Sequence, residues 1–122
     1  MSMSEGIVKP RRWQSVHTLE TFRERLRNDT IKCYSLATLK SEKNLTPAHP
    51  TRLGINLNFA VFYWDCMEDR DQAMKICNEA MEYGATNLEK LEDDSDLTDA
   101  STLLELIKEN TDMWEDIIFT EQ

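Results

Sequence analysis

The stretch AHPTRLGINLNFAVFYWD, Ala48–Asp65, decides the fold of this 122-residue chain. Pro50 is well placed for the first turn of a helix, and the residues after it are apolar on nearly every side, which is typical of a buried helix. Asn56 and Asn58 interrupt this pattern about 200° apart around the helix axis, so they cannot face the same surface. A buried amide needs hydrogen-bond partners. We therefore expect a buried helix with one amide facing a groove.

The segment before this stretch also has helical spacing. Its apolar residues predict a helix over residues 15–27, a break at Asn28–Thr30 and a second helix that ends near Leu45. Residues 1–14 lack such spacing and contain the basic cluster KPRR, so we expect a flexible basic arm there. Residues 15–119 are expected to form a single helical domain.

The segment after it contains two further helices. Asp69 with Gln72 is a capping-box-like start for the first of them. An acidic loop over residues 92–96 then leads to a last helix, capped by Thr98 or Asp99. No segment has the alternating spacing of a strand, so the chain is predicted to be all-α, with antiparallel neighbouring helices joined by short loops.

Charge and composition restrict the class of protein. The net charge is −9, with nine basic and five acidic residues in 1–50 but five basic and eighteen acidic residues in 51–122. A protein that binds nucleic acid needs a clustered positive surface, so no nucleic-acid partner is expected. No apolar run approaches the roughly 18 residues of a membrane span, and no secretory leader opens the chain. We expect a cytoplasmic protein without a membrane partner.

No motif in the chain predicts a catalytic or metal site. The three cysteines form no CxxC pair, so we expect reduced thiols, with Cys77 in the core. His49 has no catalytic partner nearby in sequence and is interpreted as a turn residue. The acidic residues 92–99 lack the ligand alternation and central glycine of a calcium loop. We therefore predict no enzyme activity, no metal and no cofactor, although a small all-α enzyme is a third hypothesis.

Several segments resemble one family. HPTRLGINLNFAVFYWD resembles the seventh helix of 14-3-3 proteins, phosphoserine- and phosphothreonine-binding adaptors that carry HP-x-RLGL-x-LNFSVFYYE at this place. CYSLATLKSEKNLTPAHP resembles their sixth helix, DRDQAMKICNEAMEYGATNLEKL their eighth, and DASTLLELIKENTDMW their ninth, DSTLIMQLLRDNLTLW. The resemblance runs from about Cys33 to Trp114. It implies a bundle similar to the last four of nine helices, preceded by a divergent N-terminal helix.

The resemblance implies a set of peptide-binding residues on two helices. The family's side chains that hold the main chain of a bound phosphopeptide match Asn58, Asn110 and Trp114. The glutamate that orients a phosphate-binding arginine matches Asp65, which keeps the charge but is one methylene shorter. The apolar wall that packs against the peptide matches Leu57, Val61, Leu103, Leu106 and Met113.

These positions also have a second interpretation that needs no ligand. Asn58 could be a core amide whose hydrogen bonds stay within the protein. Asn56 lies on another side of the helix, where its amide is expected to form hydrogen bonds within the helical bundle. Leu103, Leu106 and Trp114 could simply be core residues of a helical bundle.

The family's other helices are expected to be missing from this chain. Its first four helices form the dimer interface, and its third and fifth supply a lysine, two arginines and a tyrosine that hold the phosphate, but residues 1–32 resemble none of these. The resemblance implies an adaptor of signal transduction that binds phosphoserine or phosphothreonine peptides of partner proteins in a helical groove, with that binding impaired here. The alternative is a truncated family member that acts as a helical interaction module, independent of phosphate, on another helical chain.

Overall fold

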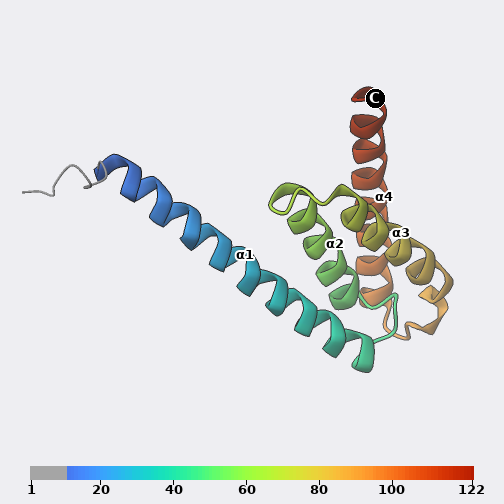
Figure 1. Cartoon of the computed structure of the whole chain (residues 1–122). Coiled ribbons are helices and arrows are strands. Elements are labelled where there is room, and N and C mark those ends of the chain that lie inside the picture. Colours follow the sequence, from blue (N-terminus) through green and yellow to red (C-terminus); the bar gives the residue numbers. More distant parts are fainter. Residues whose placement is uncertain (1–10) are drawn as a thin grey trace, which may run out of the picture. The chain divides into compact units, whose positions relative to one another are not determined.

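Four α-helices and no β-strand make up residues 11–122, the part of the chain that this computed structural model describes, with side chains described from Val16 onward (Figure 1). The all-α fold is confirmed. Two compact units divide the chain between Cys33 and Tyr34. The elements are α1 (Arg11–Asn44), α2 (Pro50–Asp65), α3 (Arg70–Thr86), the short 3-10 helix η2 (Leu88–Lys90) and α4 (Asp94–Thr120).

Helix α1 is continuous, so the break predicted at Asn28–Thr30 is wrong. Thr30 donates its hydroxyl to the Leu26 carbonyl at 2.7 Å, which keeps the side chain on the helix instead of ending it. The other two residues are exposed, where asparagine and aspartate lower helix stability by less than about 1 kcal/mol each. Of the predicted arm, residues 1–10 lie outside the described residues, whereas 11–14 belong to α1.

The turn between α1 and α2 has the histidine and proline positions that the sequence predicted. Arg52 donates from Nη1 to the Leu45 carbonyl at 3.0 Å, which ties the end of α1 to the first turn of α2. His49 is the N-cap of α2, and its Nδ1 accepts the Thr51 backbone N–H at 3.1 Å. The prediction that His49 is a turn residue is thus confirmed, and Pro50 opens the helix as expected.

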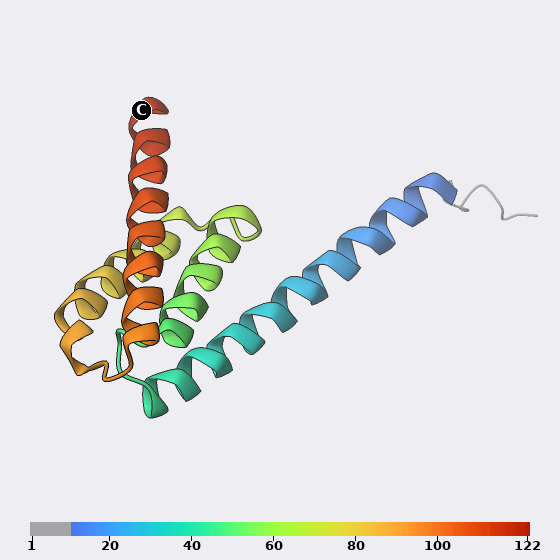
Figure 2. The same cartoon turned by 180° about the vertical axis from the view of Figure 1, so that it is seen from behind.

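Helices α2, α3 and α4 pack on one another within the second unit, as Figures 1 and 2 show from two sides. His49 Nε2 lies 3.9 Å from Asp96 Oδ2 at one end, and Trp64 stacks on Trp114 toward the other, so α2 and α4 run parallel. Helix α3 runs antiparallel to both. Its buried face consists of small residues, which let its backbone approach both neighbours: Ala73, Cys77, Ala80 and Gly84.

The predicted start of α3 is correct, whereas that of α4 needs correction. The start of α3 is confirmed, because Asp69 accepts the Gln72 backbone N–H at 3.1 Å. Helix α4 is capped by Asp93 rather than by Thr98 or Asp99, so three of the five residues of the predicted acidic loop are helical. Asp93 takes this role because its Oδ1 accepts the backbone N–H of Ser95 at 2.7 Å and that of Asp96 at 3.2 Å.

Candidate functional site

The first half of the predicted site lies on one flank of α2. Leu57 and Val61 are half-buried and pack against the core cluster that α3 and α4 complete. Asn58 and Asp65, on the outer side of the same flank, are exposed. The alternative interpretation of Asn58 as a core amide is therefore wrong. Both polar side chains are open to solvent, and neither has a hydrogen-bond or ion-pair partner within residues 16–122.

The second half lies on the neighbouring flank of α4. Leu103 is half-buried against the core, whereas Leu106 and Met113 are 46% and 52% exposed. Helical spacing places these three residues and Asn110 on one side of α4. The alternative that Leu103, Leu106 and Trp114 are all core residues therefore fails for Leu106. We call the nine predicted residues the α2–α4 wall: Leu57, Asn58, Val61, Asp65, Leu103, Leu106, Asn110, Met113 and Trp114.

Asn110 carries an unsatisfied donor on this wall. Its side chain is partly exposed, but the Nδ2 atom is buried and donates to no acceptor in the described part of the chain. A buried N–H without a partner is unfavourable by about 1–3 kcal/mol, so such groups are rare in folded proteins. An acceptor from a ligand would remove this penalty.

Trp114 is the most buried member of the wall, with 3% of its surface exposed. Its indole stacks on that of Trp64, with ring centroids 4.5 Å apart and planes inclined by 2°. The indole N–H donates to no side chain or carbonyl among residues 16–122. The indole face therefore belongs to the core, as the alternative interpretation required, while the N–H remains available to an acceptor outside the chain.

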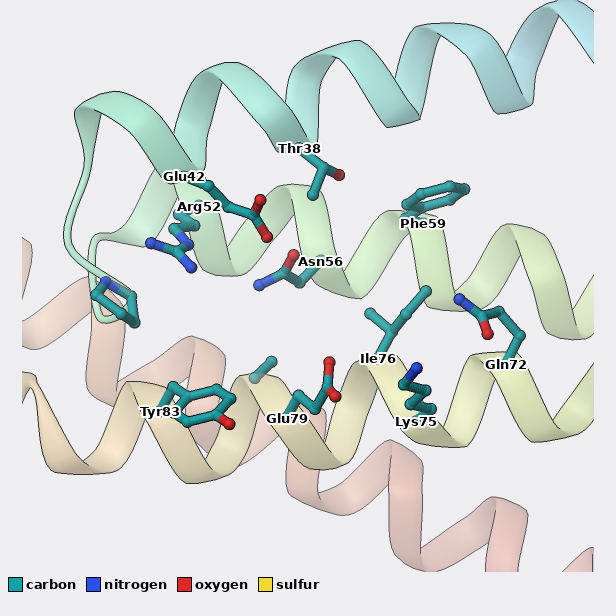
Figure 3. Close-up of a pocket in the computed structure, with 12 residues that line it drawn as sticks. Thr38, Glu42, Arg52, Asn56, Phe59, Gln72, Lys75, Ile76, Glu79 and Tyr83 are labelled. Atoms are coloured by element: carbon teal, nitrogen blue, oxygen red, sulfur yellow. The ribbon is translucent and has the colours of Figure 1, made fainter.

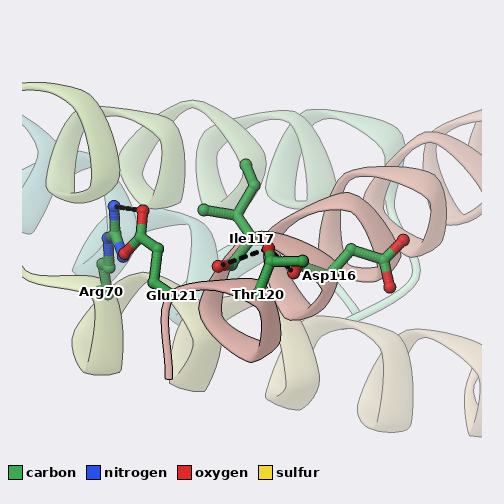
Figure 4. A network of polar contacts seen from close by, with 5 residues as sticks. All are labelled: Arg70, Asp116, Ile117, Thr120 and Glu121. Carbon is green, nitrogen blue, oxygen red and sulfur yellow. Dashed lines mark hydrogen bonds and ion pairs between the residues drawn. The ribbon is translucent and has the colours of Figure 1, made fainter.

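An ion pair between Arg70 and Glu121 lies at the end of α4 (Figure 4). The Arg70 guanidinium lies 4.7 Å from the centre of the Trp64 ring and donates to the Glu121 carboxylate. The hydrogen bond with Glu121 raises the pKa of Arg70, and the same bond lowers the pKa of Glu121. Trp64, Arg70 and Glu121 were not among the predicted site residues, because only the folded chain brings Trp64 against Trp114 and places Arg70 between Trp64 and Glu121.

The opposite flank of α2 lines a pocket that the sequence did not predict (Figure 3). Asn56 lies near its middle, between Glu42 of α1 and Glu79 of α3, and Phe59 and Arg52 are its neighbours on α2. Asn56 is partly exposed and makes no side-chain hydrogen bond within the described residues. The prediction that it satisfies the bundle is therefore wrong.

The three cysteines occupy different environments. Cys77 is 1% exposed, which confirms its place in the core, and burial raises the pKa of its thiol. Cys33 and Cys66 are free and exposed. Residues 16–122 contain no cluster of three or more His, Cys, Asp or Glu side chains that could hold a metal ion. No helix described here is long and apolar enough to cross a membrane.

Comparison with known proteins gives one consistent result. The family model for the 14-3-3 protein matches residues 15–115, so the match begins well before Cys33. The chain is 30% identical over 103 residues to 14-3-3 protein 3 of Entamoeba histolytica, covering 84% of this chain and 42% of that protein. It is 34% identical over 85 residues to 14-3-3 protein 9 of Solanum lycopersicum, covering 70% and 32%. The chain thus spans less than half the length of these relatives.

Proposed function

Because this chain belongs to the 14-3-3 protein family, we propose that it is an adaptor rather than an enzyme and that its α2–α4 wall binds phosphoserine or phosphothreonine peptides of partner proteins. One observation carries the proposal. The Nδ2 of Asn110 and the indole N–H of Trp114, four residues apart on α4, are donors without an acceptor within the described residues. An extended peptide offers main-chain carbonyls at regular spacing, which suit such a pair of donors.

The rest of the wall complements this role. Asn58, exposed on α2, adds a second amide that can both donate to and accept from a peptide main chain. The exposed side chains of Leu106 and Met113 offer apolar contact to the side chains of the peptide. Polar groups then fix the orientation of the peptide, and apolar contacts contribute most of the affinity.

The wall contains no cation to hold the phosphate. The cation beside it, Arg70, is already engaged by Glu121 and by the face of Trp64. Asp65, the expected partner of a phosphate-binding arginine, has no cation within ion-pair distance in the described structure. Charge-assisted bonds to phosphate are roughly twice as strong as neutral ones. We therefore expect this 122-residue chain alone to bind peptides weakly, with little preference for the phosphorylated form.

Fluorescence anisotropy with matched phosphorylated and unphosphorylated peptides tests this function. Asn110→Ala is expected to weaken binding about tenfold. This is a loss of about 1.4 kcal/mol of binding free energy, which one lost hydrogen bond can account for. Asn78→Ala, which removes an exposed amide from α3, is the matched control and is expected to change nothing. Tight binding selective for the phosphorylated peptide would contradict the expected weakness. Binding unaffected by Asn110→Ala would contradict the proposed site.

A second candidate function is a helical interaction module that does not depend on phosphate. The exposed apolar residues Leu106 and Met113 favour it, because exposed apolar surface of this kind often marks a protein interface. Size-exclusion chromatography tests this candidate. A monomer that stays compact on dilution and binds no protein partner would count against it.

A further inference from the structure

The N-terminal part of α1 carries an apolar stripe that nothing in its own unit covers. Its four residues are all about half exposed: Val16 55%, Leu19 53%, Phe22 56% and Leu26 48%. They recur at intervals of three and four residues, so they share one face of the helix. A helix of this kind is marginally stable in water unless its apolar face is covered. This stripe therefore needs a partner.

The charged residues beside the stripe indicate the sign of the charge that the partner surface should carry. Arg23 and Arg27 lie along one edge of the apolar face, and Arg25 lies along the other. Glu24 lies on the opposite face of the helix, whereas Glu20 lies next to Arg27 at the first edge. Three arginines and one glutamate thus border the stripe, a positive balance that suits an acidic partner with an apolar centre and disfavours pairing with a second copy of itself.

A surface with the complementary pattern is present on α4. Leu106 and Met113 are exposed there, and Glu105, Glu109 and Asp112 are exposed along their outer edge. The charge of the whole unit agrees with this pattern. Residues 1–33 contain seven basic and four acidic residues, a net charge of +3, whereas residues 34–122 contain seven and nineteen, a net charge of −12.

We propose that the apolar stripe of α1 in one copy docks on the exposed face of α4 in a second copy, and that the two copies do this reciprocally. A reciprocal exchange uses each surface once and closes as a dimer, whereas a one-way contact would continue into a filament. The apolar side chains are desolvated at the centre, and the arginines of α1 meet the carboxylates of α4 at the rim. This dimer does not depend on phosphopeptide binding. It does compete with it, because Leu106 and Met113 also belong to the α2–α4 wall.

Sedimentation velocity of the full chain over a dilution series tests the dimer. Phe22→Ala is expected to weaken dimerisation by about tenfold or more, because the ring is the largest side chain of the stripe and is 56% exposed. The dimer is also expected to weaken as salt is added. Urea unfolding followed by tryptophan fluorescence shows whether the second unit stays intact in each variant.

Charge reversal identifies the two surfaces. The double variants Arg23→Glu/Arg25→Glu on α1 and Glu105→Arg/Glu109→Arg on α4 are each expected to weaken the dimer about tenfold, since rim pairs contribute modestly and each occurs twice. Combining all four changes in one chain is expected to restore much of the lost affinity. Glu24→Arg, on the opposite face of α1, is the matched control and should leave the dimer unchanged.

Three results would overturn the proposal. The first is a chain that remains monomeric at every concentration. The second is a dimer that Phe22→Ala does not weaken, which would place the contact elsewhere. The third is a dimer that Phe22→Ala weakens but Glu105→Arg/Glu109→Arg does not, because α1 would then dock on α1 or on another acidic surface.

Discussion

The indoles of Trp64 and Trp114 lie face to face, 4.5 Å between centroids and within 2° of parallel, and so join the end of α2 to the second half of α4. Stacked aromatic pairs stabilise a protein by about 0.5–1.5 kcal/mol beyond the burial of their area. The stack also fixes the orientation of the Trp114 indole N–H. The contact with Trp64 therefore holds the Trp114 N–H, a hydrogen-bond donor of the proposed site, in a fixed orientation.

Removing Trp64 tests this coupling. Trp64→Ala is expected to lower the free energy of unfolding by about 3 kcal/mol, because it deletes the stack and exposes part of the core beneath it. Trp64→Tyr keeps an aromatic ring at this position and is expected to lose only about 1 kcal/mol. Urea unfolding measures both values. Equal losses in the two variants would show that the stack contributes nothing beyond its area.

Gly84 is required by close packing between α3 and its neighbours. A Cβ at this position would lie 2.9 Å from Leu104 Cδ2 and 3.2 Å from Leu53 Cδ2, and Leu53 is fully buried. Gly84→Ala gains about 1 kcal/mol of helix propensity but loses about 1–3 kcal/mol to overpacking, so we expect a net loss of about 1 kcal/mol.

A double-mutant cycle isolates the packing contribution at Gly84. In a Leu104→Ala background the nearest obstructing atom is gone, so Gly84→Ala is expected to become neutral or stabilising. Thermal unfolding of the four proteins gives the coupling. If Gly84→Ala destabilises both backgrounds equally, contact with Leu104 is not the cause.

The cap of α4 can be tested with two adjacent aspartates. Asp93 accepts two backbone N–H groups, whereas Asp94, the next residue, makes no side-chain cap bond. Asp93→Ala is expected to destabilise the protein by about 1 kcal/mol, and Asp94→Ala by clearly less. Chemical denaturation compares them. A larger loss of stability in Asp94→Ala than in Asp93→Ala would show that the helix begins at a later residue.

The Arg70–Glu121 pair predicts a pH dependence of stability. The hydrogen bond from Arg70 lowers the pKa of Glu121 in the folded chain below its unfolded value of about 4.3. The pair therefore stabilises the fold above that value, and the contribution is lost as pH falls through the lowered pKa. We expect Glu121→Gln to be less stable than the parent at neutral pH and equally stable in strong acid. The difference should also shrink in high salt, because both side chains are about half exposed.

The sequence predicted those parts of the fold that depend on neighbouring residues. Pro50 and the Asp69–Gln72 pair mark helix starts because the hydrogen bonds and steric limits involved are local. The same reasoning predicted a break in α1 at Asn28–Thr30, where none exists. Residues with moderate helix propensity are compatible with a cap or a helix interior, and only the rest of the chain decides between them.

The site was predictable as a set of positions but not as an arrangement. The resemblance placed Asn58, Asn110 and Trp114 on one wall, and helical spacing agrees. Whether each is exposed depends on contacts between helices that no local pattern encodes. Trp114 is covered because Trp64 lies against it, and Asn56 is uncovered because a pocket separates α1 from α3 at that point.

The parallel course of α2 and α4 has an electrostatic consequence. Each helix has a partial positive charge at its N-terminus and a partial negative charge at its C-terminus, so two parallel neighbours place like charges side by side. At the N-terminal ends lie Asp93 and Asp96, the latter beside His49. At the C-terminal ends lies the Arg70 guanidinium, although it belongs to the first turn of α3. The bundle therefore has an electrical axis along α2 and α4, with carboxylates at its positive pole and the Arg70–Glu121 ion pair at its negative pole.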